Sequence, residues 1–244
     1  MTPPPALAAT VLLFLGLGPT VGPHPSPDPT AMADERPVLL YVMDPLCGWC
    51  YAFGHELDEV RRQLADSIDV QLVLGGMVTG DREGPMGDMA GYILGAIPRL
   101  ESYTGVRIGE PYKEQLRQGT RWSSSVPPSL AIAAFRTLAP DRTVAFAHEV
   151  QHACFRDGLD LNDKALYPTL AARHGVDGAQ LTAAMADPAA KLAFEADMRR
   201  SADLGVQGFP AVFLVHKGST RPVCSGYRSA ADLLAAVRAA LRPR

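Results

Sequence analysis

The order of apolar and polar residues between positions 38 and 74 predicts a strand, a helix and a second strand. Residues 38–43 are a continuous apolar run typical of a buried strand, and Pro45 ends it because proline has no amide hydrogen to donate. Over residues 48–65, apolar side chains recur at i, i+4, i+7 and i+11, which is the period of a helix with one buried face. Residues 69–74 form a second apolar run. Together they predict a βαβ unit whose two strands are parallel and adjacent.

The helical period dominates the middle of the chain. It predicts helices at 86–101, 112–118, 128–139, 142–157, 164–174 and 178–186. A longer helix follows, because Asp187 can cap it and Pro188 suits its first turn. Strand patterns return at 211–216 and 221–225, and a last helix follows a capping box at Ser229.

This order of elements predicts an α/β chain in which one sheet is split by an inserted all-helical domain. Residues 37–83 and 187–244 are expected to form the domain that contains the sheet, and residues 84–186 the insertion. Residues 1–36 are expected to be a disordered extension, since their proline-rich second half cannot build a packed core.

The extension contains an apolar stretch, residues 6–18, which is too short to span a membrane at about 20 residues per helix. It matches the apolar part of an export signal, but such signals carry positive charge before that part, and the first Lys or Arg here is Arg36. Two interpretations stay open: a degenerate export signal, or an extension that is absent from a chain beginning at Met32. The first implies a periplasmic protein. The second implies a cytoplasmic one, which we favour, and we expect no membrane span.

Composition changes this picture little. Hydrophobic residues make up 47% and charged residues 20% of the chain, as in ordinary globular proteins, and a net charge of −3 gives no basic field for nucleic acid. Four cysteines are too few for a disulfide scaffold in a chain of 244 residues. Cys154 and Cys224 are isolated in the sequence, and we expect each to be buried as a small apolar residue.

The other two cysteines, Cys47 and Cys50, flank Gly-Trp at the predicted start of the first helix. At a helix N-terminus, free amide hydrogens and the helix dipole stabilise a thiolate, which is the nucleophilic form of cysteine. A second cysteine one turn inside can attack the resulting mixed disulfide and release the product. A structural disulfide would close too short a loop to add much stability, and a metal site would need two further ligands at suitable spacing. The spacing therefore favours thiol–disulfide exchange.

The sequence Gly208-Phe209-Pro210 immediately precedes the predicted strand at 211–216. Proline cannot donate to a sheet, so Pro210 is either a simple strand-start residue or a cis-proline in a fixed turn. The residues alone leave both possibilities open.

These features together resemble the DsbA-like branch of the thioredoxin superfamily, and within it the FrnE-like and predicted protein disulfide isomerase members. The resemblance rests on the Asp-Pro-Leu-Cys-Gly-Trp-Cys-Tyr-Ala run at 44–52, the helical insertion and the late Gly-Phe-Pro-Ala, and it covers residues 37–241. It implies a thioredoxin-like fold in which Cys47 is the exposed nucleophile, Cys50 is the resolving thiol and Pro210 is a cis-proline facing them.

The resemblance also implies the kind of substrate. In that family the backbone beside the proline pairs with a substrate peptide, which makes Gly208, Phe209 and Trp49 candidate substrate-binding residues. The expected partners are proteins or peptides that carry thiols or disulfides, together with glutathione or another redox partner. No cofactor and no metal are expected.

The chain departs from that family at one position. Thioredoxin and DsbA have a buried carboxylate six residues before the first cysteine, where this chain has Tyr41. Asp44 is the nearest acid and is therefore a candidate proton shuttle for Cys50. The Gly-Trp dipeptide differs from those of thioredoxin and DsbA, so the preferred redox direction stays open.

Two other functions compete with thiol–disulfide exchange. The run from His148 to His152 matches the His-Glu-x-x-His helix of zinc proteases, but no third ligand follows at suitable spacing. We expect both histidines to lie on the surface of a packed helix. Kappa-class glutathione transferases and chromene-carboxylate isomerases resemble this layout but have serine in place of the reactive cysteine. The intact Cys-x-x-Cys pair argues against that alternative.

Overall fold

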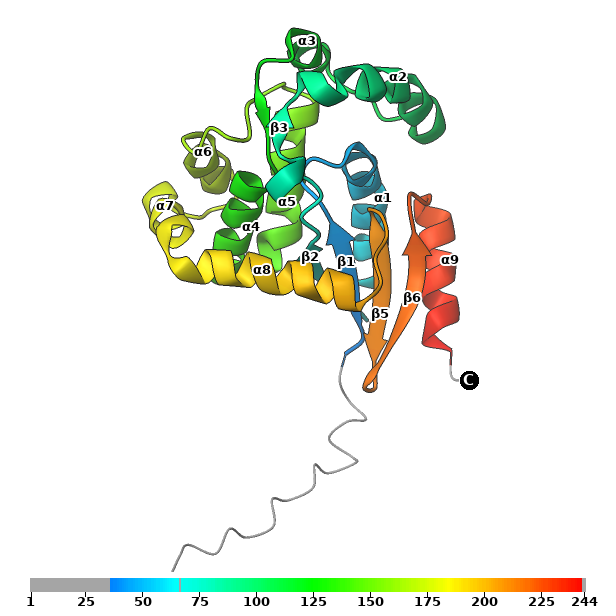
Figure 1. Cartoon of the computed structure of the whole chain (residues 1–244). Helices are drawn as coiled ribbons and strands as arrows, with labels where there is room; N and C mark the ends of the chain where they lie inside the picture. Colours follow the sequence, from blue (N-terminus) through cyan, green and yellow to red (C-terminus); the bar gives the residue numbers. More distant parts are fainter. Residues whose placement is uncertain (1–35, 66, 243–244) are drawn as a thin grey trace, which may run out of the picture.

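The computed structural model describes residues 36–65 and 67–242. The predicted extension, apart from Arg36, lies outside the described residues, and so do both interpretations of its apolar stretch. The elements of the described part follow one another in the predicted order (Figure 1). No helix among them is long and apolar enough to cross a membrane.

A four-stranded mixed sheet forms the centre of the fold. Its strands are β1 (Val38–Met43), β2 (Asp69–Leu74), β5 (Ala211–His216) and β6 (Ser219–Ser225), in the order β2-β1-β5-β6. β1 and β2 are parallel and adjacent, as the βαβ pattern predicts, and β5 is antiparallel to both β1 and β6. β6 begins before the predicted residue 221 because its pairing with β5 continues to the turn, where His216 faces Ser219.

The central strand β1 is buried on both faces of the sheet. Leu39, Tyr41 and Met43 belong to the large hydrophobic core, which also contains residues of α1 (Gly48–Leu64) and α9 (Ala230–Leu241). Leu40 and Val42 belong to a smaller cluster on the other face, since successive side chains of a strand point to opposite sides. Helix α1 starts from the loop that follows this buried strand, so its N-terminus is fixed by the core.

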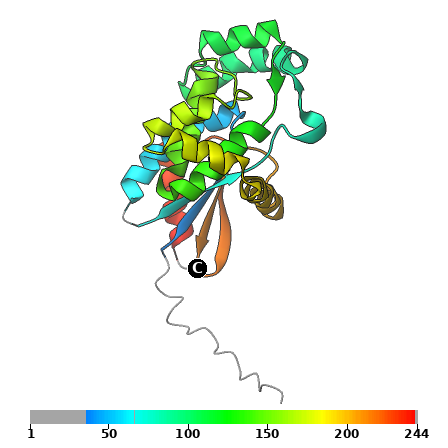
Figure 2. The ribbon, with the colours of Figure 1, turned by 90° about the vertical axis from the view of Figure 1, so that its left-hand side faces the viewer.

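In the described part of the chain, six α-helices lie between β2 and α8 (Pro188–Asp203). They are α2 (Gly87–Thr104), α3 (Glu110–Gln118), α4 (Val126–Leu138), α5 (Thr143–Phe155), α6 (Leu166–Arg173) and α7 (Gly178–Ala186). Each matches a predicted helix to within a few residues. α4 begins before the predicted residue 128, because prolines fit a first helical turn, where amide hydrogens have no partner within the helix. Figures 1 and 2 both show α2 and α3 at the end of the molecule opposite the C-terminus.

The helical block is not helical throughout, which corrects the expectation of an all-helical insertion. β3 (Gly84–Pro85) pairs with β4 (Trp122–Ser123) in an antiparallel ladder, and 3₁₀ turns lie at Gly80–Arg82 and Pro140–Arg142. Strands of two residues are too short to show an alternating pattern, so hydrophobic periodicity cannot reveal them. The domain boundaries near residues 84 and 186 stay a prediction.

A largely buried ion pair attaches the helical block to the edge of the sheet. Arg136 on α4 donates to the Asp197 carboxylate on α8 at 2.8 Å and to the Leu72 carbonyl on β2 at 3.1 Å. The Leu74 amide donates to the same carboxylate at 3.2 Å. Burial raises the pKa of Asp197, and the Arg136 charge opposes that shift. The pair therefore joins α4 and α8 to β2.

Gly109, the N-cap of α3, packs tightly against the end of α5. Its amide donates to the Phe155 carbonyl at 2.8 Å, and a Cβ at this position would lie 1.9 Å from the Arg156 carbonyl oxygen. The φ of −64° suits alanine, so the obstacle is purely steric. We expect Gly109→Ala to lower the free energy of unfolding by about 1–3 kcal/mol, as overpacking usually does.

Gly95→Ala is the matched control, because a Cβ at Gly95 inside α2 would meet no atom within 4 Å. There alanine should raise the free energy of unfolding by about 0.5–1 kcal/mol through its better helix propensity. Urea unfolding followed by circular dichroism measures both variants. Equal midpoints would show that this contact does not hold α3 in place.

Candidate active site

Cys47 is the N-cap residue of α1, where the sequence places it. Its amide donates to the Asp44 carbonyl at 3.1 Å, and its sulfur accepts a hydrogen bond from the Cys50 amide at 3.4 Å. The strand before it ends at Met43, two residues before the proline that cannot extend it. The amide hydrogen of Cys50 and the positive end of the α1 dipole are both groups that favour a negative charge at this position.

Cys47 is less exposed than the resemblance implies, which corrects that expectation. Only 6% of its surface is accessible, against 0% for Cys50. Helix α2 packs over the start of α1, so closely that a Cβ at Gly48 would lie 3.3 Å from the Leu100 side chain. Cys47 borders a cavity of about 640 Å³, so it is reached through this cavity rather than from an open surface.

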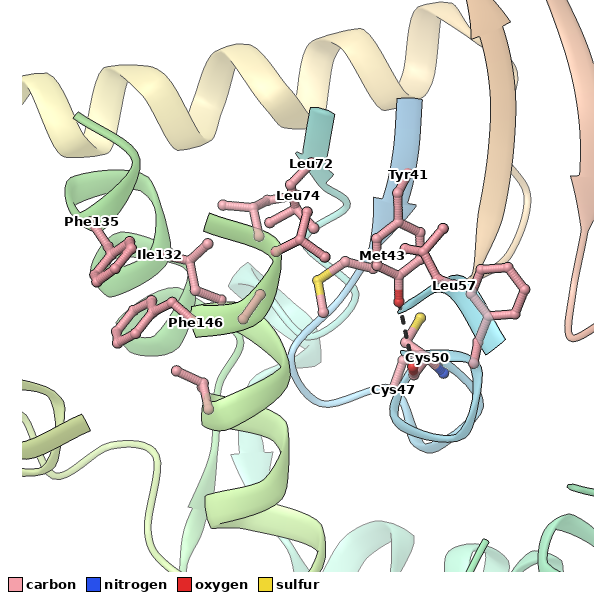
Figure 3. Packing of buried hydrophobic residues seen from close by; sticks show 14 of the residues in the cluster. Tyr41, Met43, Cys47, Cys50, Leu57, Leu72, Leu74, Ile132, Phe135 and Phe146 are labelled. Atoms are coloured by element: carbon pink, nitrogen blue, oxygen red, sulfur yellow. Dashed lines mark hydrogen bonds between the residues drawn. The ribbon is translucent and has the colours of Figure 1, made fainter. Parts of the chain in front are cut away.

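Cys50 is enclosed by the core beneath α1. Burial raises its pKa well above the ordinary value, and its hydrogen bond and charge interaction with Cys47 raise it further. The Tyr41 hydroxyl donates to the Cys50 carbonyl at 3.3 Å (Figure 3). Tyr41 is itself fully buried, and that burial is the main reason why its pKa lies well above the usual value. A neutral hydroxyl thus stands where the resemblance leads us to look for a carboxylate.

The loop before β5 lies beside Cys47. The Phe209–Pro210 peptide bond is cis, which decides between the two possibilities that the sequence leaves open. The Cys47 thiol donates to the Phe209 carbonyl at 3.6 Å, while Pro210 is buried and Gly208 is exposed. The loop is anchored to the end of β6, because the Gly226 amide donates to the Pro210 carbonyl at 2.7 Å.

The cavity beside Cys47 is formed mainly by the helical block. Its walls come from the start of α1, one side of α2, the β3–β4 ladder and the end of α5. Apolar side chains dominate the lining, and four of them are also large and more than a third exposed: Met89, Tyr92, Trp122 and Leu159. The sequence gives no sign of this cavity, because its walls come from separate segments that carry no shared motif.

Trp49 belongs to a group of three aromatic rings next to the cysteine pair. Its ring centroid lies 6.1 Å from that of Tyr103 on α2 and 6.4 Å from that of Tyr227 before α9. The two tyrosines are 5.8 Å apart and complete the group. Trp49 is half-buried and Tyr103 is exposed, so the group presents an aromatic surface beside the site. The sequence points to Trp49 only, since neither tyrosine belongs to a motif.

Asp44 is fully buried and accepts hydrogen bonds from three segments. One oxygen accepts from the Leu46 amide at 2.9 Å and the Ser125 hydroxyl at 2.8 Å, and the other from the Met77 amide at 2.6 Å. Burial raises the pKa of this carboxyl, and the three donors act in the opposite direction. The geometry gives Asp44 a positioning role, while its role as a proton shuttle stays a prediction.

The two histidines of the His-Glu-x-x-His run do not form a surface stripe, which corrects that expectation. His148 is 8% exposed, because α5 packs its ring against α1, where Nδ1 lies 3.2 Å from the Asp58 carboxylate. His152 is half-buried and packs edge-on against Tyr51, with ring centroids 5.3 Å apart. Within residues 36–65 and 67–242, no three His, Cys, Asp or Glu side chains are grouped closely enough to hold a metal ion.

Residues 38–238 match the family model described as the DSBA-like thioredoxin domain. A search of curated proteins found no match. Among solved structures, a proposed protein disulfide isomerase from Nitrosomonas europaea has a TM-score of 0.75 at 22% identity, over 85% of this chain and 98% of that one.

The cytosolic disulfide reductase DsbM from Pseudomonas aeruginosa has a TM-score of 0.71 at 26% identity, over 84% of this chain and 98% of that one. Its structure with GSH has a TM-score of 0.66 at 25% identity, over 84% of this chain and 100% of that one. The family match spans most of the chain and confirms the fold that the resemblance implies. The chain therefore belongs to the DSBA-like thioredoxin domain family and is a thiol–disulfide oxidoreductase of the DsbA type.

Proposed function

We propose that Cys47 and Cys50 are the redox pair of this oxidoreductase, with Cys47 attacking the substrate disulfide and Cys50 resolving the intermediate. The observation that carries this assignment is the contrast between the two sulfurs. Cys47 lies at the N-terminus of α1, beside a cavity and the Phe209 carbonyl, whereas Cys50 is fully enclosed one turn further on. A substrate can therefore reach the first sulfur and not the second.

The exchange proceeds in two steps on these atoms. The Cys47 thiolate attacks one sulfur of a substrate disulfide, the substrate S–S bond breaks, and one substrate thiol leaves. The Cys50 thiol then loses its proton and attacks the Cys47 sulfur, which forms the Cys47–Cys50 disulfide and releases the second substrate thiol. Two electrons pass from the cysteine pair to the substrate, and an external thiol must return them before the next turnover.

We further propose glutathione as that external thiol. The support is the relationship to the disulfide reductase DsbM, whose structure with GSH shares 25% identity with this chain. Two glutathione molecules supply the two electrons: the first forms a mixed disulfide with the pair, and the second releases oxidised glutathione. The pair then returns to two thiols.

The surroundings of Cys47 support a peptide substrate. The apolar cavity can hold side chains that flank the substrate cysteine, since contact between apolar surfaces is the main favourable term in such binding. The residues 208–210 are not part of the cavity wall, so they approach Cys47 from another side. We propose that Gly208 and Phe209 meet the substrate backbone there, and that Trp49 contributes its aromatic face.

Replacing Cys50 by serine should trap the substrate on Cys47. The resolving thiol is then missing, so a mixed disulfide with a peptide disulfide should accumulate to nearly one per chain, while turnover falls by at least about 100-fold. Mass spectrometry of the unreduced protein, with and without dithiothreitol, measures the adduct.

Cys47→Ser should form no adduct, and Cys224→Ser is the matched control that should keep turnover within about twofold. Full turnover by Cys50→Ser would contradict the redox pair. It would favour the glutathione transferase type of chemistry, which needs a single reactive group.

The four thiols should differ in their rates of alkylation. Cys47 should react first with iodoacetamide at pH 7, because a helix N-terminus favours a thiolate; Cys154 also borders the cavity, but it lies near the end of α5. Burial raises the pKa of Cys154 to about 12 and that of Cys224 to about 11, and it raises that of Cys50 strongly, so these three should react at least about tenfold more slowly. Peptide mapping by mass spectrometry gives the order, with the protein in 6 M guanidinium as the control in which all four react alike. A faster Cys50 would reverse the assigned roles.

Gly75→Ala should slow the attack by Cys47 without unfolding the protein. A Cβ at Gly75 would lie 2.1 Å from the Phe209 ring, so the ring and its carbonyl beside Cys47 must move. A displacement of about 1 Å at a reacting centre can cost up to about 100-fold in rate. Gly91→Ala, at a site with no atom within 4 Å, is the control. An unchanged rate of peptide disulfide reduction in Gly75→Ala would remove the Phe209 loop from the substrate site.

A further inference from the structure

The resolving step needs a base, and the structure does not provide the usual one. Under the proposed roles of Cys47 and Cys50, on which this need rests, the Cys50 thiol must lose its proton in the core, where burial disfavours the thiolate. The neutral Tyr41 hydroxyl stands where a carboxylate could accept the proton. The carboxylate of Asp44 already accepts hydrogen bonds from three donors.

His148 packs against the face of α1 that carries Cys50, because residues four apart on a helix share a face and the ring meets Gly54. Its ring sits over Gly54, one helical turn after Cys50, where a Cβ would be 3.0 Å from His148 Nε2 and Cδ2. A side chain at that position would press against the ring, so glycine lets the ring pack closely on α1. The ring also packs edge-on against Tyr41, with centroids 6.2 Å apart, and the Tyr41 hydroxyl donates to the Cys50 carbonyl at 3.3 Å. Tyr41 therefore contacts both His148 and Cys50.

The Asp58 carboxylate decides which ring nitrogen of His148 can act as a base. It lies 3.2 Å from Nδ1, so Nδ1 carries the hydrogen and Nε2 keeps its lone pair in the neutral ring. Nε2 is buried and has no hydrogen-bond partner among the described residues. A buried acceptor nitrogen without a donor is uncommon in folded proteins and calls for an explanation. Proton uptake during the reaction provides one.

Asp58 also connects the ring to solvent. Its side chain is 48% exposed, and Arg61 pairs with it at 3.0 Å. Burial raises the pKa of Asp58, but the hydrogen bond with His148 and the pairing with Arg61 outweigh this effect and leave it below the usual value. The carboxylate is thus ionised at neutral pH and stabilises a protonated ring. The titratable and charged groups around His148 are Asp58, Arg61 and Cys50 on α1, Tyr41 on β1 and His152 on α5.

We propose that His148 is the base that takes up the Cys50 proton when Cys50 resolves the mixed disulfide, with Asp58 holding the ring in the required tautomer. In this step the S–H bond of Cys50 breaks and the proton passes to His148 Nε2, which lies over the same face of α1. The sulfur lone pair forms the Cys50–Cys47 bond, the bond between Cys47 and the substrate breaks, and the substrate leaves as a thiolate. The imidazolium then releases its proton to solvent beside Asp58.

A chromogenic aromatic disulfide such as Ellman's reagent separates the two steps. At half an equivalent per chain, the attack by Cys47 releases one coloured thiolate, and resolution by Cys50 releases the second. Stopped-flow absorbance between pH 5.5 and 9 gives a rate for each phase. In the unmodified protein, the second phase should rise through the pH range in which a histidine titrates and then level off.

His148→Gln should leave the first phase within about twofold of the unmodified protein. The second phase at pH 7 should fall at least about tenfold, since a general base contributes on the order of 10²–10⁴-fold. It should also lose the inflection in the histidine range and rise steadily with pH. His152→Gln is the matched control, with the same change one turn along α5 but with a ring that packs on Tyr51, and both phases should stay unchanged.

Asp58→Asn tests the inference while keeping the ring in place. Without the carboxylate the imidazolium is less stable, so the inflection of the second phase should move to lower pH. An unmoved inflection in this variant would overturn the role of the pair, even if His148→Gln proved unable to fold.

Two further results would also overturn the inference. One is a second phase in His148→Gln that follows the unmodified protein at every pH. The other is an equal fall of both phases with an unchanged pH profile, which is what a purely structural role would produce. If the unmodified protein instead released only one thiolate, the redox pair itself would be contradicted, and the inference with it.

Discussion

The buried carboxylate of Asp44 holds together the three segments that surround the redox pair. Its donors come from the loop before α1, from the segment after β2 and from the start of α4, and the charge-assisted hydrogen bonds are worth on the order of 1.5–3 kcal/mol each. Without these donors a buried carboxylate would be strongly unfavourable. Asp44 therefore fixes the position of Cys47 at the end of the loop. It also fixes the cavity wall near Cys47, although it takes no part in the proposed exchange.

The chemical difference between the two cysteines follows from one turn of helix. The Cys47 sulfur accepts the Cys50 amide hydrogen at the N-terminus of α1 and borders a cavity, so it lies where a substrate can arrive. Cys50 points into the core that buries Tyr41, so its charge is disfavoured until it is needed. The difference in burial between the two sulfurs thus assigns the attack on substrate to Cys47 and the resolving step to Cys50. The same burial creates the need for a base within the core.

Much of this arrangement could be predicted because it is local in the sequence. The βαβ unit, the helices of the block and the place of Cys47 at a helix N-terminus all depend on residues within a few turns of one another. The features that escaped prediction join distant segments: His148 and Asp58 are 90 residues apart, and Cys47 and Phe209 are 162 apart. Hydrophobic periodicity shows which face of a helix is apolar, but it does not show what packs against that face. For this reason the sequence does not reveal that α2 packs over the start of α1 and that Cys47 is buried.

The His-Glu-x-x-His run shows how packing decides the meaning of a spacing. Two histidines four residues apart share one side of a helix, which suits a zinc site only when a third ligand faces them. In this fold the two rings meet different neighbours. His148 fills the space above Gly54 and meets the Asp58 carboxylate, whereas His152 meets the ring of Tyr51. A carboxylate beside one ring nitrogen and no partner on the other suit a proton acceptor better than a metal ligand. The missing acid at the position of Tyr41 and the unexpected histidine on α5 are therefore two parts of one arrangement.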